Sequence, residues 1–360
     1  MSWPALASLL VLCLAHSPRA SFFRSPFPNA DFEPYGSDYF GQPSGRWSNG
    51  RLFIDIITQG LGIGMLSPYL KSLGSNFTRG VSFASSGSTA QNSTAVGTNS
   101  GGLFTLLVQI DQFREFQDYV LLQKKGVSEK LQMRQHFSNS VYLIETAHND
   151  YIKVAFKTEE FDPIALMVAV ISAMRIALQA LFDLGARIFL VMNVTPLGCN
   201  PSTASNPYRT ENRDEYGCKV DYLTLVNMHN DHLVELLSEF RLKYPMAHWI
   251  LFDAYSIMLD GYHNPSKYGV KYPFRACCGY GGGTYNYDED IQCGQAGEYI
   301  NGTYAEATKC EDPSLYIIWD SLHPVESFCH HLAQGVLDGT HLSPYFNVTE
   351  KFKMETHAQI

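Results

Sequence analysis

The feature that most constrains the fold is an alternation of helix and strand in the middle of the chain. Residues 164–184 form a long apolar run, with Asp162 as a helix cap and Pro163 at the first helical position. Gly185 follows the last apolar residue and ends the helix. The apolar run 187–194 comes next and is typical of a buried strand. These residues predict one helix–strand unit.

A second unit repeats the order. A helix is predicted over 222–244, Pro245 stops it, and residues 248–255 form another apolar strand. Strands joined by helices of this length form a parallel sheet with helices on both faces. Arg175 and Gln179 lie inside the first helix, and a strand follows it directly, which favours a buried crossover helix over a membrane span.

The first half of the chain supplies further elements of the same kind. Residues 27–50 are rich in Pro, Gly, Asn and Ser and predict a loop, and a helix begins at 51–61. Residues 103–120 repeat apolar positions with a helical period, and 141–146 form a short strand. With no internal repeat or long linker, the sequence predicts a single α/β domain.

Composition excludes some partners. The 360 residues are 45% hydrophobic, enough for one large buried core, and only 17% charged. The formal net charge is −9, and no basic stripe is present that could displace counterions from phosphates. The chain is therefore not expected to bind nucleic acid or to insert stably into a membrane.

The N-terminus predicts export. Residues 5–15 are an apolar run of the length found in secretory leaders, too short to span a bilayer, although the first four residues carry no Lys or Arg. Cleavage is expected between Ala15 and Ala20, leaving residues 1–20 as the leader and 21–350 as the domain. Sequons support a secreted, extracellular protein, with glycans expected at four of them: Asn76, Asn92, Asn301 and Asn347. The sequon at Asn193 lies in an apolar strand and is expected to be unused.

Cysteine usage agrees with an oxidising compartment. Cys199 and Cys218 would close a local loop, and Cys329 is left over as a buried thiol. Two more bridges of open connectivity are expected among four cysteines: Cys277, Cys278, Cys293 and Cys310. The adjacent pair does not have the spacing of zinc ligands.

The motif WDSLHP near the C-terminus could carry chemistry. Asp320 stands three residues before His323, so on a helical turn its carboxylate can reach a ring nitrogen and orient the imidazole as a general base. A chance pair in a surface turn is the alternative, since the chain has 12 histidines.

Several segments in order point to a family. They include PYGSDYFGQPSGRWSNGRLFIDII (34–57), GVSFASSGST (80–89), AHND (147–150), VMNVTPLGCNP (191–201), RACCGYGGGTYN (275–286) and WDSLHPVE (319–326). The chain resembles the plant GDSL esterases/lipases of the SGNH hydrolase superfamily. That resemblance implies a flavodoxin-like three-layer sandwich, hydrolysis of small-molecule ester or lipid substrates, and no cofactor or metal.

The resemblance also assigns roles. His323 matches the general base and Asp320 the carboxylate that orients it. Asn149 matches an asparagine whose amide donates to the oxyanion, and either Gly80 or Gly87 would donate a backbone N–H to the same atom. Taken outside the family, these glycines would be read as ordinary turn residues and Asn149 as a helix cap or turn residue.

The nucleophile block departs from the family pattern. The string Gly-Asp-Ser-x-Ser-Asp occurs nowhere in the chain. Three hypotheses follow: a truncated product that has lost the block, a degenerate block in which residues 10–15 are the first strand and Ser17 is the nucleophile, or a pseudoenzyme that binds a ligand. Two smaller departures, Ser82 for asparagine and Ala147 for glycine, would fit a relaxed site.

Two other functions share these residues. Trp47, Trp249 and the Tyr-rich stretch 279–290 could form a carbohydrate- or lipid-binding surface, although Trp249 is also a natural core residue of its strand. An acyltransferase would use the whole esterase site and differ only in excluding water and admitting an alcohol acceptor.

Overall fold

A computed structural model of the chain describes residues 30–70, 74–91, 104–154, 162–206, 212–298 and 302–357, and the backbone of 9–12. Ser17, Asn92 and Asn301 lie outside these ranges, as do residues 13–20 of the expected leader.

The described residues form a central sheet of seven strands in the order β11-β6-β5-β4-β1-β3-β2. Its neighbours pair in parallel, except that β11 runs antiparallel to β6. In chain order these strands are β1 (Leu9–Leu12), β2 (Ser67–Pro68), β3 (Gly80–Ser82), β4 (Val141–Ile144), β5 (Ile188–Met192), β6 (His248–Phe252) and β11 (Leu342–Ser343). Two small antiparallel pairs lie outside the sheet: β7 (Cys278–Gly279) with β10 (Thr308–Lys309), and β8 (Ala296–Glu298) with β9 (Tyr304–Glu306).

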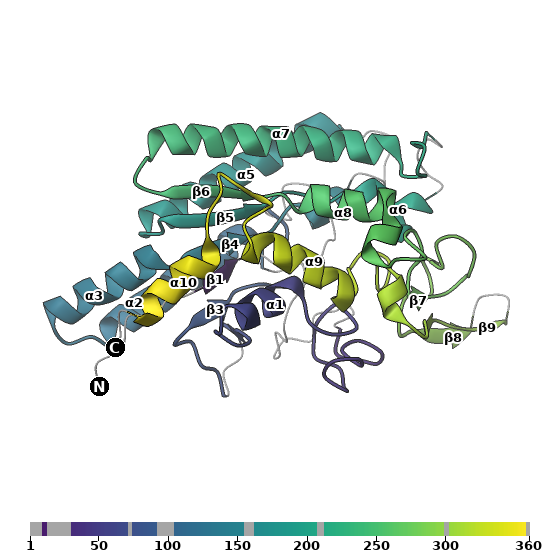
Figure 1. Cartoon of the computed structure of the whole chain (residues 1–360), viewed down its shortest axis with the longest axis horizontal. Coiled ribbons are helices and arrows are strands. Elements are labelled where there is room, and N and C mark those ends of the chain that lie inside the picture. The colour runs from purple at the N-terminus through teal and green to yellow at the C-terminus, as the bar shows by residue number, and fades with distance from the viewer. Residues whose placement is uncertain are drawn as a thin grey trace.

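Helices cover both faces of the sheet (Figure 1). One layer contains α2, α3, α5 and α7, and the other contains α1, α8 and α9. The bounds are α1 (Phe53–Gly60), α2 (Leu106–Leu122), α3 (Val127–Asn139), α4 (His148–Val154), α5 (Pro163–Asp183), α6 (Pro201–Ala204), α7 (Val220–Lys243), α8 (Ala254–His263), α9 (Glu326–Leu337) and α10 (Val348–His357), with single 3-10 turns at Leu197–Cys199, Pro265–Tyr268 and Pro313–Leu315.

Strand side chains explain the three layers. Along β4, Val141 and Leu143 join the core under α1 and α9, whereas Tyr142 and Ile144 join the core under α5 and α7. Successive residues of a strand point to opposite faces, so a continuous apolar run can fill two cores at once. The predicted parallel pairing of the two strands in the middle of the chain is confirmed, with Ile188 opposite His248.

The crossover helix α5 begins where its cap residues predict. The Asp162 side chain accepts hydrogen bonds from the backbone N–H groups of Ile164 and Ala165, and Gly185 adopts a φ of +101° just after the helix. Of the described helices, α5 has the length and hydropathy of a membrane span. One face packs on the sheet and α7, while Ile164 and Val168 on the other are more than half exposed.

Strand β1 gives the apolar N-terminal run a place in the sheet. Leu9–Leu12 pairs in parallel with β3 on one side and β4 on the other. Counted along the chain, the five central strands then have the order 2-1-3-4-5, which is that of flavodoxin-like sheets. A leader cleaved between Ala15 and Ala20 would take this strand with it, so one molecule cannot both lose residues 1–20 and keep β1.

The disulfides and the last described helix complete the fold. Phe352 on α10 joins the core beyond residue 350, where the sequence placed the end of the domain. The predicted Cys199–Cys218 bridge is confirmed, and the two open bridges are Cys277–Cys310 and Cys278–Cys293. Cys329 is a buried free thiol, as expected.

Candidate active site

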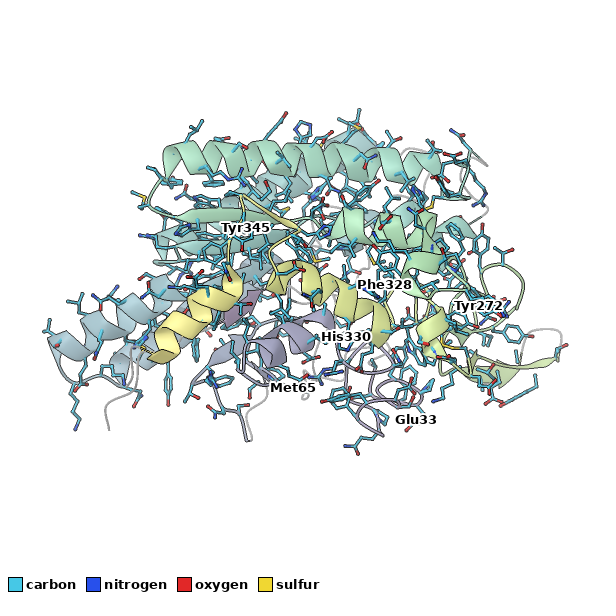
Figure 2. All side chains as sticks on the ribbon, viewed as in Figure 1. Glu33, Met65, Tyr272, Phe328, His330 and Tyr345 are labelled. Atoms are coloured by element: carbon cyan, nitrogen blue, oxygen red, sulfur yellow. A yellow bond between two sulfur atoms is a disulfide. The ribbon has the colours of Figure 1, made fainter. Side chains whose placement is uncertain are left out.

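Asp320 and His323 form an aligned pair in the turn before α9, the helix on which Figure 2 labels Phe328 and His330. The Asp320 Oδ2 atom lies 2.7 Å from His323 Nδ1. The predicted contact is therefore present. The prediction of a helical turn is wrong, because residues 320–323 form bends. Asp320 Oδ1 accepts the backbone N–H groups of Ser321, Leu322 and His323, and these bonds hold the turn.

The Asp320 carboxylate has one more partner, which sequence reasoning missed. The Tyr35 hydroxyl donates to Asp320 Oδ2 over 2.9 Å, with both residues buried. Burial opposes ionisation of Asp320, but the His323 charge and the hydrogen bonds from His323 and Leu322 together outweigh it, and the pKa of Asp320 lies well below its usual value. Burial and the neighbouring Asp320 raise the pKa of Tyr35, so this phenol stays a donor.

Trp47 connects the imidazole to the glycine-containing loop after β3. Its ring lies 5.2 Å from the His323 ring, centroid to centroid, and its indole N–H donates to Ser86 Oγ over 2.9 Å. Trp47 also packs edge-on against Tyr35 at 5.2 Å. Trp47, which is also a candidate for a carbohydrate- or lipid-binding surface, therefore lies beside His323.

A buried ion pair anchors the segment that carries Trp47. Arg46 donates to both carboxylate oxygens of Asp55, over 2.7 and 2.9 Å. The same carboxylate accepts the backbone N–H of Leu52 at the start of α1. A small pocket lies beside this ion pair and is lined in part by Leu66 and Ser82. It is not lined by Asp320 or His323, so we do not assign the substrate to it.

The loop contacts separate the two candidate glycines. Asn149, on the first turn of α4, donates its side-chain amide to the backbone oxygen of Ser88 over 2.9 Å. Gly87, the neighbour of Ser88, has a φ of +72°, which a residue without Cβ adopts readily. Gly80 is the first residue of β3 and lies at the opposite, amino end of that strand. Of the two, Gly87 lies beside Asn149 on the carboxyl side of the sheet.

The two departures from the family pattern have visible local consequences. Ala147 lies just before α4 with a φ of +80°, a left-handed conformation that glycine adopts at lower cost. Ser82 is buried on β3, and its hydroxyl has no hydrogen-bond partner among the described residues. Both positions flank Asn149 and Gly87 in the chain.

Other predicted residues fall outside this site. Trp249 is a core residue, stacked on Phe189 with ring centroids 4.0 Å apart. The Asn193 amide is buried between Asp253 and Tyr255, in agreement with an unused sequon, whereas Asn76 and Asn347 are exposed. Within the described ranges, no group of three His, Cys, Asp or Glu side chains could hold a metal ion.

An imidazole oriented by a carboxylate, at the carboxyl ends of parallel strands, is an arrangement found in α/β hydrolases. Residues 32–345 match the family described as GDSL-like lipase/acylhydrolase. The chain belongs to this GDSL esterase/lipase family of plant hydrolases, as the sequence blocks predicted.

The relatives share most of the chain. A GDSL esterase/lipase of Arabidopsis thaliana is 33% identical over 90% of this chain and 86% of its own length. The GDSL esterase/lipase ENOD8 of Medicago truncatula is 35% identical, over 90% of this chain and 83% of the relative. A Hevea brasiliensis protein named esterase is 31% identical, over 86% and 80%.

Proposed function

We propose that this chain hydrolyses carboxylic esters of small molecules or lipids by serine-type acyl transfer. The observation that carries the proposal is the aligned Asp320–His323 pair, joined through Trp47 to the loop that also contacts Asn149. We assign the domain to the flavodoxin-like sandwich of the SGNH hydrolases, with its site at the carboxyl ends of the strands.

In the proposed mechanism His323 takes the proton of the nucleophilic hydroxyl as its oxygen attacks the ester carbonyl. The Gly87 N–H and the Asn149 amide hold the oxyanion that forms. Collapse of this tetrahedral intermediate breaks the bond to the leaving alkoxide, which receives the proton from His323. Water then attacks the acyl enzyme, with His323 as base, and releases the acid.

Ser17 is the proposed nucleophile. Counted from the last residue of β1, it is five residues along the chain, and β1 lies between the strands whose ends lead to Gly87 and Asn149. Three disulfides among the described residues and the exposed sequons at Asn76 and Asn347 support an extracellular location.

The test is hydrolysis of p-nitrophenyl acetate and butyrate by the full chain and three variants: His323→Ala, Ser17→Ala and, as a surface control, His232→Ala. Turnover that is lost in His323→Ala and Ser17→Ala but kept in His232→Ala supports the mechanism. Loss only in His323→Ala retains the esterase but assigns the nucleophile elsewhere. No turnover from a folded wild-type protein contradicts the enzyme and leaves a ligand-binding pseudoenzyme, which the missing Gly-Asp-Ser string would explain.

A further inference from the structure

A second imidazole has a carboxylate three residues away, beside the proposed oxyanion donor. Glu145 and His148 flank the turn between β4 and α4, and Glu145 Oε1 lies 2.7 Å from His148 Nδ1. Both side chains are buried, with 2% and 10% of their surface exposed. The two atoms do not have the geometry of a hydrogen bond, so the contact is one of proximity. The proposed mechanism does not use either residue.

The partners of the other ring nitrogen fix the state of His148. The backbone N–H of Thr195 donates to His148 Nε2 over 3.2 Å, and the Thr195 hydroxyl lies 3.0 Å from the same nitrogen. A nitrogen that accepts a backbone N–H carries no proton, so the ring is neutral and its proton is on Nδ1, facing Glu145. Since a backbone donor occupies its lone pair, His148 is poorly placed to act as a general base.

The loop that holds His148 is itself fixed. Thr195 follows Val194, whose N–H and C=O are both bonded to the side-chain amide of Asn230, over 2.9 and 3.0 Å. One residue earlier, the Asn193 amide donates to Asp253 over 2.8 Å. The residues after β5 are therefore held in place, and the contact of His148 with Thr195 connects the end of β4 to them.

The contact between His148 and Thr195 bears on the position of Asn149. Asn149 follows His148 in the chain, and Ala147, which precedes His148, holds a left-handed conformation that persists only where neighbouring residues enforce it. We propose that Glu145, His148 and Thr195 form a positioning relay that fixes the Asn149 amide for oxyanion binding. This inference rests on the proposed function, but part of its test does not.

The kinetic test compares His148→Ala and His148→Gln with His232→Ala. The control is matched, because His232 also has a carboxylate three residues away, Glu235 at 2.9 Å, but on the exposed surface of α7. We expect His148→Ala to lower kcat about 10- to 100-fold, with KM changed less than about twofold, because small displacements of oriented groups have effects of this size. His148→Gln, whose carbonyl can accept the Thr195 N–H, should recover most of the loss. A kcat like that of His232→Ala would overturn the relay.

If the wild type shows no turnover, the proposed function fails, but two further measurements still test the positioning relay. Nitrogen NMR of labelled histidines should show His148 as a neutral ring protonated on Nδ1, and a proton on Nε2 would overturn the relay. The amides of Ala90 and Gln91, bonded to Asp150 on the same turn of α4, report on the position of that turn. In His148→Ala their hydrogen exchange should accelerate about tenfold, and exchange equal to that of His232→Ala would contradict the proposal.

Discussion

Replacing Tyr35 with phenylalanine tests how the Asp320 carboxylate is held. The ring of Tyr35 packs against Phe32, Trp47 and Trp319, and phenylalanine keeps these contacts while removing only the hydroxyl. A hydrogen bond to a charged group is worth about 1.5–3 kcal/mol. Since Asp320 Oδ2 still accepts the His323 ring, the lower part of that range is expected, about 1.5–2 kcal/mol.

The assay is urea denaturation with Tyr142→Phe as the matched control. Tyr142 is also fully buried, but its hydroxyl donates to a neutral acceptor, the backbone oxygen of Phe137, over 2.9 Å. Its loss is expected to cost about 1 kcal/mol. With an m value near 3 kcal/mol/M, Tyr35→Phe should lower the midpoint by about 0.5 M or more. A shift no larger than that of Tyr142→Phe would refute the reasoning.

The effect has a defined pH dependence. The pKa of Asp320 is lower in the folded protein than in the unfolded chain, so its ionisation stabilises the fold above about pH 4. That stabilisation is lost as the pH falls through the folded value. The difference between wild type and Tyr35→Phe should therefore be constant from pH 5 to 8 and shrink only as the pH falls through the lowered pKa that Asp320 has in the folded protein. A difference that grows on acidification would contradict a charged acceptor.

Three further outcomes follow from the fold. Deleting residues 1–20 removes Leu9–Leu12 from between two parallel strands. Circular dichroism and urea unfolding should then show a protein that is destabilised by several kcal/mol or unfolded. Unchanged stability would exclude β1 from the native sheet. In a secreted preparation, glycopeptide mass spectrometry should find a glycan at exposed Asn76 and none at buried Asn193; a glycan on Asn193 would contradict its burial. The Cys329 thiol, whose pKa is raised by burial, should react with a disulfide reagent in urea but not in buffer; a fast native reaction would place it at the surface.

Features set by neighbouring residues could be predicted from the sequence. Asp162, Pro163 and Gly185 bound α5, because caps and left-handed ends act within one turn of a helix. The pairing of Asp320 with His323 is equally local, since they are three positions apart, although the backbone that joins them forms bends. Family blocks added the hydrolase family, because short segments in a fixed order are specific where each alone is not.

Features that depend on distant segments needed the tertiary structure. The sequence does not distinguish Gly80 from Gly87 as an oxyanion donor. Only the direction of β3 and the Asn149–Ser88 contact distinguish them. Tyr35 lies 285 residues from Asp320, a separation at which no local pattern operates.

The cysteines and the N-terminal run show the same division. Adjacent Cys277 and Cys278 bridge to different partners, Cys310 and Cys293, and this choice depends on how the loops to those cysteines return. The run containing Leu9–Leu12 has the composition of a secretory leader and of an inner strand alike, because both must be apolar throughout. The sequence determined that this run is buried in something apolar. Only the tertiary structure, in which β1 pairs with β3 on one side and β4 on the other, decided that the sheet can be that place.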